Sequence, residues 1–315
     1  MFSKLKVVFM GTPDFSVPVL RKLIEYCDVI GVVTQPDKVI GRGDKVSYSP
    51  VKKEALVFNI PVLQPEKIRK EYQQILDLKP NIIITCAYGQ IIPEEILNYP
   101  EYGCINVHAS LLPKLRGGAP IHHAILDDYS ETGITIMYMD KGMDTGNIIS
   151  QRKIKILDTF NVGKLHDKLS EMGADLLIET LPSIIKGNNV SIPQNESEVT
   201  FGYNIKREEE ELDFNKDCRT IFNHIRGLNP FPGAYFKLDG ITYKIYDSEY
   251  KVCKDYKNSK CGEIVEFDKN NFTIKCLNGL IYIKELKKEG KRQMLIKDYL
   301  NGEKDNLINK VITKE

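Results

Sequence analysis

The sequence lacks long hydrophobic runs, zinc-binding cysteine patterns and a strong charge of either sign. No apolar run approaches the ~18 residues of a membrane-spanning helix, and no signal peptide is evident, so we expect no membrane span. The cysteines number seven, and no Cys-x-x-Cys pair or His/Cys cluster has zinc spacing. These absences predict reduced thiols, no metal site and a cytoplasmic protein.

Charge is nearly balanced over the 315 residues, with a formal net charge of +1. This excludes an overall electrostatic attraction to nucleic acid or membrane. Residues 206–315 carry a net charge of +3 and the remainder −2. This mild basic lean suits a weak polyanion-binding surface, although a solvated lysine-rich face explains it equally well.

The chain is long enough for about two domains of roughly 150 residues each. In the predicted first domain, residues 1–187, strand-like and helical patterns alternate, which indicates a mostly parallel, doubly wound, Rossmann-like sheet. The predicted strands are residues 5–10, 29–34, 81–87 and 103–107, later joined by 134–139 and 148–156, and the predicted helices are 15–26, 119–126 and 161–186.

Residues 188–207, rich in Asn, Ser, Pro, Gln and Glu, are predicted to be a linker. Residues 208–315 then change character. A helix is expected over 218–227, followed by five short strands at 234–238, 242–246, 262–267, 272–276 and 280–286. Five short strands separated by turns predict a small β-barrel of the OB-like type.

Asn106 and His108 lie at the end of the predicted strand 103–107. Their spacing puts both side chains on one side of a strand, and the carboxyl ends of such strands are where ligands bind. An amide can donate to an oxyanion, and an imidazole can carry a proton. A structural pair that caps the strand is the alternative, but the irregular apolar loop after it favours a functional role.

An aspartate could fix the charge state of this imidazole, and the turn over residues 139–146 offers both Asp140 and Asp144. Either could instead be an ordinary turn residue. From the residues alone the two remain equal candidates. The turn over residues 11–14 lacks both G-x-G-x-x-G and the Walker lysine, so we interpret it as a sharp strand-to-helix turn.

A glycine-containing basic loop spans residues 35–50 and includes Arg42 and Lys45. Composition leaves two interpretations open. The loop is an exposed mobile segment, or it orders on contact with a polyanion.

Taken together, several motifs resemble the formyltransferase family over nearly the whole chain. These are residues 34–37, 41–43, 49–52, 87–89, 103–120, 140–146 and 226–232. The chain departs from the family pattern at Leu115 and Phe231, where Trp is common, and it has no Trp at all. Both replacements are apolar or aromatic, and they bear on local packing and tRNA contacts, not on the chemistry.

The resemblance implies transfer of a formyl group from 10-formyltetrahydrofolate to the α-amino group of methionine on initiator tRNA, without a metal. It implies that Arg42 and Lys45 bind the tRNA and that residues 208–315 extend this surface. We expect a monomer. The residues it implies for catalysis are Asn106, His108 and Asp144, and those for folate binding are Ser110, Leu111, Leu112 and Pro113, with Gly89 and Ile91 as further candidates.

Two other functions remain in view. A formyltransferase acting on a small amine, such as a ribonucleotide or an amino sugar, would have a similar catalytic core. The basic loop and the second domain favour a tRNA acceptor, since a small amine needs neither. A non-catalytic nucleic-acid-binding protein is the other alternative, and the intact set of Asn106, His108 and Asp144 argues against it.

Overall fold

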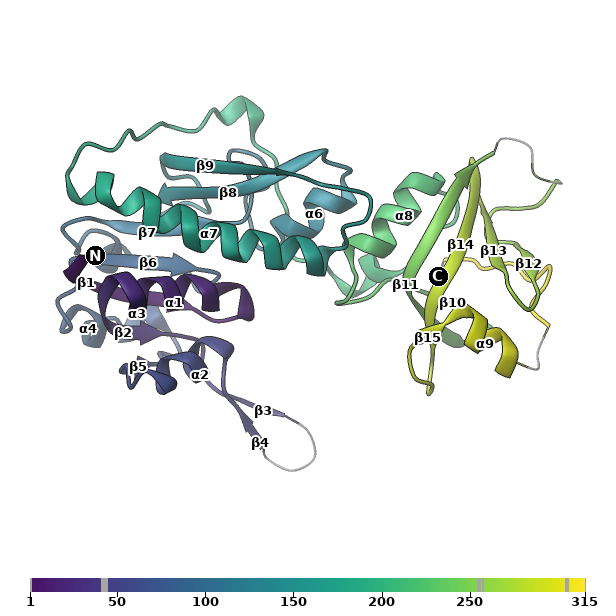
Figure 1. The fold of residues 1–315 in the computed structure, drawn as a ribbon, viewed down its shortest axis with the longest axis horizontal. Coiled ribbons are helices and arrows are strands. Elements are labelled where there is room, and N and C mark those ends of the chain that lie inside the picture. The colour runs from purple at the N-terminus through teal and green to yellow at the C-terminus, as the bar shows by residue number, and fades with distance from the viewer. Residues whose placement is uncertain (1, 41–44, 254–255, 257, 304–305, 315) are drawn as a thin grey trace. The chain divides into compact units, whose positions relative to one another are not determined.

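The structure is a computed structural model that describes residues 2–40, 45–253, 256, 258–303 and 306–314 (Figure 1). Its contacts divide the chain into two compact units. Unit 1 comprises Met1–Pro120, Glu131–Lys155 and His166–Gly202, and unit 2 comprises Ile121–Ser130, Ile156–Leu165 and Tyr203–Glu315. The domain limits predicted from the sequence, with the first domain ending at residue 187 and the second beginning at residue 208, remain a prediction.

Unit 1 is built on a sheet whose described strands are ordered β5-β2-β1-β6-β7-β8-β9. The pairs from β5 to β7 are parallel, and β8 and β9 are added antiparallel at one edge. The predicted mostly parallel, doubly wound sheet is confirmed. The strands are β1 (Phe2–Gly11), β2 (Cys27–Val33), β5 (Val62–Leu63), β6 (Ile82–Cys86), β7 (Cys104–His108), β8 (Glu131–Tyr138) and β9 (Ile148–Lys155).

Helices cover both faces of this sheet. Figure 1 shows α1 and α7 crossing one face. On the other face, Val8 and Met10 alternate out of β1 and pack with Ile68, Ile75 and Ile96 of three short helices. The helical segments are η1 (Asp14–Ser16), α1 (Val17–Tyr26), α2 (Pro50–Val57), α3 (Ile68–Glu71), α4 (Gln73–Leu76), α5 (Glu94–Leu97), α7 (Val162–Ile185) and η2 (Glu196–Glu198). The helix α6 (Pro120–Leu126) belongs to unit 2 from Ile121 on.

Coverage of both faces explains why every residue of β6 is buried, as its continuous apolar sequence predicts. The structure adds elements that the pattern did not predict. Within the loop 35–50, β3 (Lys38–Ile40) pairs antiparallel with β4 (Lys45–Ser47). The helices α3, α4 and α5 span four residues each, too short for a helical period to show in sequence.

Unit 2 contains a curled antiparallel sheet in the order β10-β11-β14-β13-β12, with β15 paired to β14. Among the described residues the two end strands, β10 and β12, do not pair, so the barrel is open there. The five predicted strands and the barrel-like class are confirmed. The strands are β10 (Tyr235–Leu238), β11 (Ile241–Val252), β12 (Ile264–Phe267), β13 (Phe272–Cys276), β14 (Gly279–Lys288) and β15 (Met294–Leu295).

One amphipathic helix, α8 (Cys218–Gly227), packs on β11 and β14 of this sheet. Ile221 and Ile225 enter the hydrophobic core beside Phe236. Asp217 caps the helix by accepting a hydrogen bond from the Thr220 amide, which satisfies one of its free N–H groups. Unit 2 also contains η3 (Arg207–Glu210) and α9 (Ile296–Gly302).

The seven cysteines are all free thiols in the structure. Across the described part of the chain, no helix combines the length and the apolar character needed to cross a membrane.

Candidate active site

Asn106 lies near the carboxyl end of β7, directly opposite Thr85 of the neighbouring parallel strand β6. The Thr85 hydroxyl donates a hydrogen bond of 2.9 Å to the amide oxygen of Asn106. The amide nitrogen therefore points the other way, and it lies 3.4 Å from Oδ1 of Asp144. The sequence analysis did not single out Thr85, because a buried threonine in a strand is typical of β-structure.

His108 ends β7 and is only 6% exposed. Its Nε2 lies 3.0 Å from the backbone carbonyl of Leu115, so Nε2–H is the donor there. Its Nδ1 faces Oδ1 of Asp144 at 3.6 Å. A ring protonated on both nitrogens would therefore donate to one oxygen on each side.

Asp144 adopts a left-handed backbone conformation, with φ of +56°. Its Oδ2 accepts a hydrogen bond of 2.9 Å from the Gly117 amide. Asp140, the competing candidate, instead accepts from the Gly142 amide and the Thr145 hydroxyl of its own turn. Of the two aspartates, Asp144 is the one that lies beside His108 and Asn106.

The three side chains converge on one atom, Oδ1 of Asp144. The two contacts that reach it are long, at 3.4 and 3.6 Å. Contacts between catalytic groups often tighten only around the reacting group. An amide donor, an imidazole and a carboxylate at one point can stabilise an oxyanion and move a proton, which is what acyl transfer requires.

The predicted folate loop follows β7 directly. The Ser110 hydroxyl donates within the loop to the Lys114 carbonyl, and the Leu112 amide donates to Thr135 of β8. Leu112 is buried, while Leu111 and Pro113 are half-buried. The loop is thus held by its own polar groups and offers a partly exposed apolar surface.

Gly89 lies in the segment that follows β6, at the same carboxyl edge of the sheet. Its φ of +91° is a conformation that favours glycine. The preceding carbonyl, of Tyr88, accepts hydrogen bonds of 3.0 Å from both Thr12 and Gln35, which follow β1 and β2. These loops from neighbouring strands therefore fix the backbone around Gly89.

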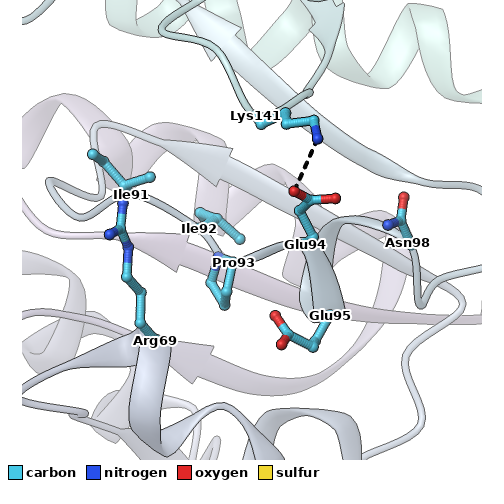
Figure 2. Close-up of a pocket in the computed structure, with 8 residues that line it drawn as sticks. All are labelled: Arg69, Ile91, Ile92, Pro93, Glu94, Glu95, Asn98 and Lys141. Atoms are coloured by element: carbon cyan, nitrogen blue, oxygen red, sulfur yellow. Dashed lines mark hydrogen bonds and ion pairs between the residues drawn. The ribbon is translucent and has the colours of Figure 1, made fainter.

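Ile91 is 66% exposed and lines a cavity of about 640 Å³ (Figure 2). In Figure 2, Ile91 and Arg69 are drawn at the left, and Lys141 and Glu94 at the right are joined by an ion pair of 3.1 Å. Lys141 belongs to the turn that carries Asp144, so this cavity and the candidate catalytic group share one loop. The cavity is lined by Arg69, Ile91, Ile92, Pro93, Glu94, Glu95, Asn98 and Lys141.

The predicted tRNA-binding residues Arg42 and Lys45 belong to the loop 35–50. Arg42 lies outside the residues that the structure describes, and Lys45 is the first residue of β4. Their contacts stay predictions.

Two cysteines lie on the strands that carry the site, Cys86 at the end of β6 and Cys104 at the start of β7. Burial raises the pKa of each thiol to about 12. Both are therefore protonated at neutral pH and unsuited to nucleophilic catalysis. In the described part of the chain, no three or more His, Cys, Asp or Glu side chains are grouped so as to hold a metal ion.

Comparison with known families matches both parts of the chain. Residues 5–181 match the family described as formyl transferase, and residues 204–304 match the formyl transferase C-terminal domain. The methionyl-tRNA formyltransferase of Staphylococcus aureus strain MW2 is 51% identical over 308 residues, covering 97% of this chain and 98% of that protein. Its counterpart from strain JH1 has the same identity and coverage.

Two solved structures share the fold. The sugar 3N-formyl transferase WlaRD, solved with dTDP and 5-N-formyl-THF, has a TM-score of 0.68 and 22% identity, covering 91% of this chain and 99% of that one. HypX from Aquifex aeolicus, in complex with tetrahydrofolic acid, has a TM-score of 0.63 and 16% identity, covering 95% and 47%. The family resemblance indicated by the sequence motifs is confirmed.

Proposed function

This chain belongs to the formyl transferase family, and on that basis we propose that it transfers a formyl group from 10-formyltetrahydrofolate to the α-amino group of methionine on initiator tRNA. The product serves translation initiation. The observation that carries the proposal is the 51% identity to methionyl-tRNA formyltransferases over 97% of the chain. A sugar amine is the less supported acceptor, because the sugar formyltransferase of similar fold is only 22% identical.

The reaction needs a neutral amine as nucleophile. Free α-amino groups have pKa values of about 7.7–8.0, and esterification of the carboxyl group lowers them. A useful fraction is therefore neutral at pH 7 without a strong base. The greater need is to stabilise the tetrahedral oxyanion and to protonate the folate nitrogen when its bond to the formyl carbon breaks.

Asn106, His108 and Asp144 meet that need in this proposal. The Asn106 amide and a protonated His108 donate to the oxyanion that forms when the amine attacks the formyl carbon. Because Nε2 of His108 donates to Leu115, the Nδ1–H is the donor that turns to the oxyanion, exchanging its long contact of 3.6 Å with Asp144 for the reacting group. Asp144 stabilises the imidazolium, and a water beside it carries the proton lost by the amine to the departing folate nitrogen.

The folate ring is proposed to lie against the loop Ser110-Leu111-Leu112-Pro113, with Gly89 and Ile91 as further contacts. The partly exposed Leu111 and Pro113 offer the apolar surface that such a ring requires. Residues 208–315, together with Arg42 and Lys45, are proposed to bind the tRNA.

The proposed acceptor also bears on location and assembly. Initiator tRNA is used where translation occurs, so we place the protein in the cytoplasm. We propose that it acts as a monomer, because the sequence contains no long apolar seam. The proposed domain limits are 1–187 for catalysis and 208–315 for tRNA binding.

Initial rates with three acceptors test the proposal: charged initiator methionyl-tRNA, the same tRNA uncharged, and a nucleotide-linked amino sugar. We expect the charged tRNA to be formylated about 10²-fold or more faster than the sugar, and the uncharged tRNA not at all. A faster reaction with the amino sugar would replace the proposed acceptor. Tight tRNA binding without formyl transfer would favour the non-catalytic alternative.

A further inference from the structure

A segment with little regular structure, residues 192–202, runs along two loops of the candidate active site within unit 1. We call it the return segment. Ile192 exchanges backbone hydrogen bonds of 2.8 and 2.9 Å with Ile148, the first residue of β9. Near the other end, Phe201 forms an isolated parallel bridge with Arg116, and Gly202 donates to the Arg116 carbonyl at 2.8 Å. The segment is therefore anchored beside the turn of Asp144 and the loop after His108.

Gln194 of the return segment holds the turn that carries Asp144. Its Nε2 donates hydrogen bonds of 2.7 Å to the Asp144 carbonyl and 2.8 Å to the Gly146 carbonyl. Its Oε1 accepts a bond of 3.0 Å from Nε of Arg116. Both amide N–H groups and the amide oxygen are thus used, so the side chain has one orientation.

Arg116 is itself fixed. It is only 3% exposed, and its guanidinium pairs with Glu196 of the return segment at 2.7 Å. A buried guanidinium with this partner gives Gln194 a rigid donor. Arg116, Gln194 and Glu196 form one connected set that ends on the backbone of Asp144.

The turn needs such support because Asp144 is left-handed, a conformation that residues other than glycine adopt less readily. Gly146, the second residue held by Gln194, has no room for a side chain, since a Cβ would overlap the Tyr138 carbonyl. Two hydrogen bonds from Gln194 therefore hold a strained turn in the conformation that directs the Asp144 carboxylate to His108.

Thr200 acts on the other side of the imidazole. Its hydroxyl accepts a hydrogen bond of 2.9 Å from the Leu115 amide, and its carbonyl accepts one of 2.9 Å from the Arg116 amide. Leu115 is also left-handed, with φ of +58°. Its carbonyl is the acceptor of His108 Nε2–H, so Thr200 fixes the group that sets the tautomer of the ring.

We infer that Gln194 and Thr200 are positioning residues for the reaction, which act through Asp144 and through the Leu115 carbonyl to orient His108 between two oxygen acceptors. The inference rests on the proposed function and extends it. The return segment thus supports the catalytic groups through the backbone of two loops.

Gln194→Glu tests the first contact, because it keeps the shape and places a carboxylate oxygen against two carbonyls. We expect kcat for charged tRNA to fall about 10- to 100-fold with KM for tRNA unchanged. In an Asp144→Asn background the same change should have little further effect, because both act through one group. Glu198→Ala, an exposed position in the same segment, is the control and should leave kcat unchanged.

Thr200→Val removes the hydroxyl acceptor and should lower kcat, whereas Thr200→Ser keeps it and should retain activity. A thermal melt of each variant identifies any general loss of folding. Wild-type kcat in Gln194→Glu, or a loss that adds in full to that of Asp144→Asn, would overturn the inference for Gln194. Equal kcat in Thr200→Val and Thr200→Ser would overturn it for Thr200.

A readout without substrates separates this inference from the proposed function. The imidazole proton chemical shifts of His108, followed by NMR, should move in Gln194→Glu and Thr200→Val and stay in place in Glu198→Ala and Thr200→Ser. Unmoved shifts in the first pair would contradict the positioning role. If the His108 shifts move in these variants and the wild-type protein does not formylate charged tRNA, the positioning role is supported and the proposed acceptor is rejected.

Discussion

A buried hydroxyl helps to fix which way the Asn106 amide points. Thr85 is 2% exposed and donates to the amide oxygen, which leaves the amide nitrogen facing Asp144. Without that donor the amide can rotate, and its oxygen would then face a carboxylate oxygen. The donor role proposed for Asn106 therefore depends on Thr85.

We expect Thr85→Val to lower kcat about 5- to 10-fold, the effect of one lost hydrogen bond, with KM for both substrates unchanged. Thr85→Ser keeps the hydroxyl and should remain near wild type. Steady-state formylation kinetics on the pair provide the check. Equal kcat values for the serine and valine variants would show that the amide is oriented by something else.

Some residues of the site could be predicted from sequence and others could not. The period of a strand places Asn106 and His108 on one side of β7, and the structure brings both together. Asp140 and Asp144 lie in one turn, so the sequence does not distinguish them. In the structure, the left-handed backbone of Asp144 and its hydrogen bond from the Gly117 amide direct that carboxylate to the site. Gln194 is one polar residue in a polar segment, so composition gives no signal of its contacts.

At the scale of elements, Arg219 joins α8 of unit 2 to two other segments of that unit. Arg219 lies 2.8 Å from Asp128 and 2.7 Å from Asp158. The hydrogen bonds from Arg219 hold the pKa of the Asp128 carboxyl below its usual range. A depressed carboxyl pKa gives stability that is present above the unfolded pKa of about 3.9 and is lost as pH falls through the folded value.

Asp128→Asn should therefore destabilise the protein at pH 7 by no more than about 1 kcal/mol, because the carboxylate is half exposed and screened. Asparagine tolerates the left-handed backbone of this position, so the change isolates the charge. Urea unfolding at several pH values checks it. The difference from wild type should shrink below pH ~4; a difference that stays constant down to pH ~2 would contradict the ion-pair explanation.

The loop 35–50 is the element for which a tRNA contact is predicted. Arg42→Ala should raise KM for charged tRNA, leave KM for the folate unchanged, and lower the salt dependence of tRNA binding by about one phosphate contact. Kinetics at two salt concentrations measure all three. Unchanged tRNA kinetics would remove this loop from the proposed binding surface.

The sequence predicts elements best where they are long. The helix α7 spans 24 residues and α8 spans 10, enough for an apolar stripe to repeat. The strand β15 and the helix α9 were missed, as were the four-residue helices, because short elements take their structure from packing and not from a pattern. The return segment has hardly any regular structure, yet it contacts two loops of the site.

At the scale of the molecule, each unit is built from several separate segments of the chain. The buried core of unit 2, by contrast, comes from a single segment. Every buried residue of that core lies between Leu212 and Ile312. Arg219, by contrast, binds Asp128 and Asp158, which belong to the earlier segments 121–130 and 156–165 of the same unit. Its ion pairs therefore depend on chain outside the core.

A fragment of residues 203–315 should fold, because it contains every buried residue of this core. Arg219→Ala should lower its stability only slightly, because within the fragment Arg219 keeps its ring contacts with Phe222 and Tyr250 but has lost both carboxylates. In the full chain the same substitution should lower stability, since both carboxylate partners are present. Circular dichroism and urea unfolding of the four proteins check this. An equal loss in fragment and full chain would show that Arg219 acts through residues such as Phe222 and Tyr250 and not through Asp128 and Asp158.

The fold does not determine which acceptor receives the formyl group. A sugar formyltransferase and HypX share the architecture at 22% and 16% identity, so the fold alone is compatible with several acceptors. This chain is distinguished by its 51% identity to methionyl-tRNA formyltransferases over 97% of its length. The acceptor and the role of Asn106, His108 and Asp144 can be tested together.

Single-turnover formylation tests the central proposal most directly. Excess enzyme saturated with 10-formyltetrahydrofolate is mixed with charged initiator methionyl-tRNA, and formyl-methionine is followed in wild type, Asn106→Ala and Asp144→Asn. We predict transfer by the wild type and a loss of about 10²- to 10³-fold in each variant, with tRNA affinity unchanged. No transfer by the wild type, or a wild-type rate in either variant, would contradict the account.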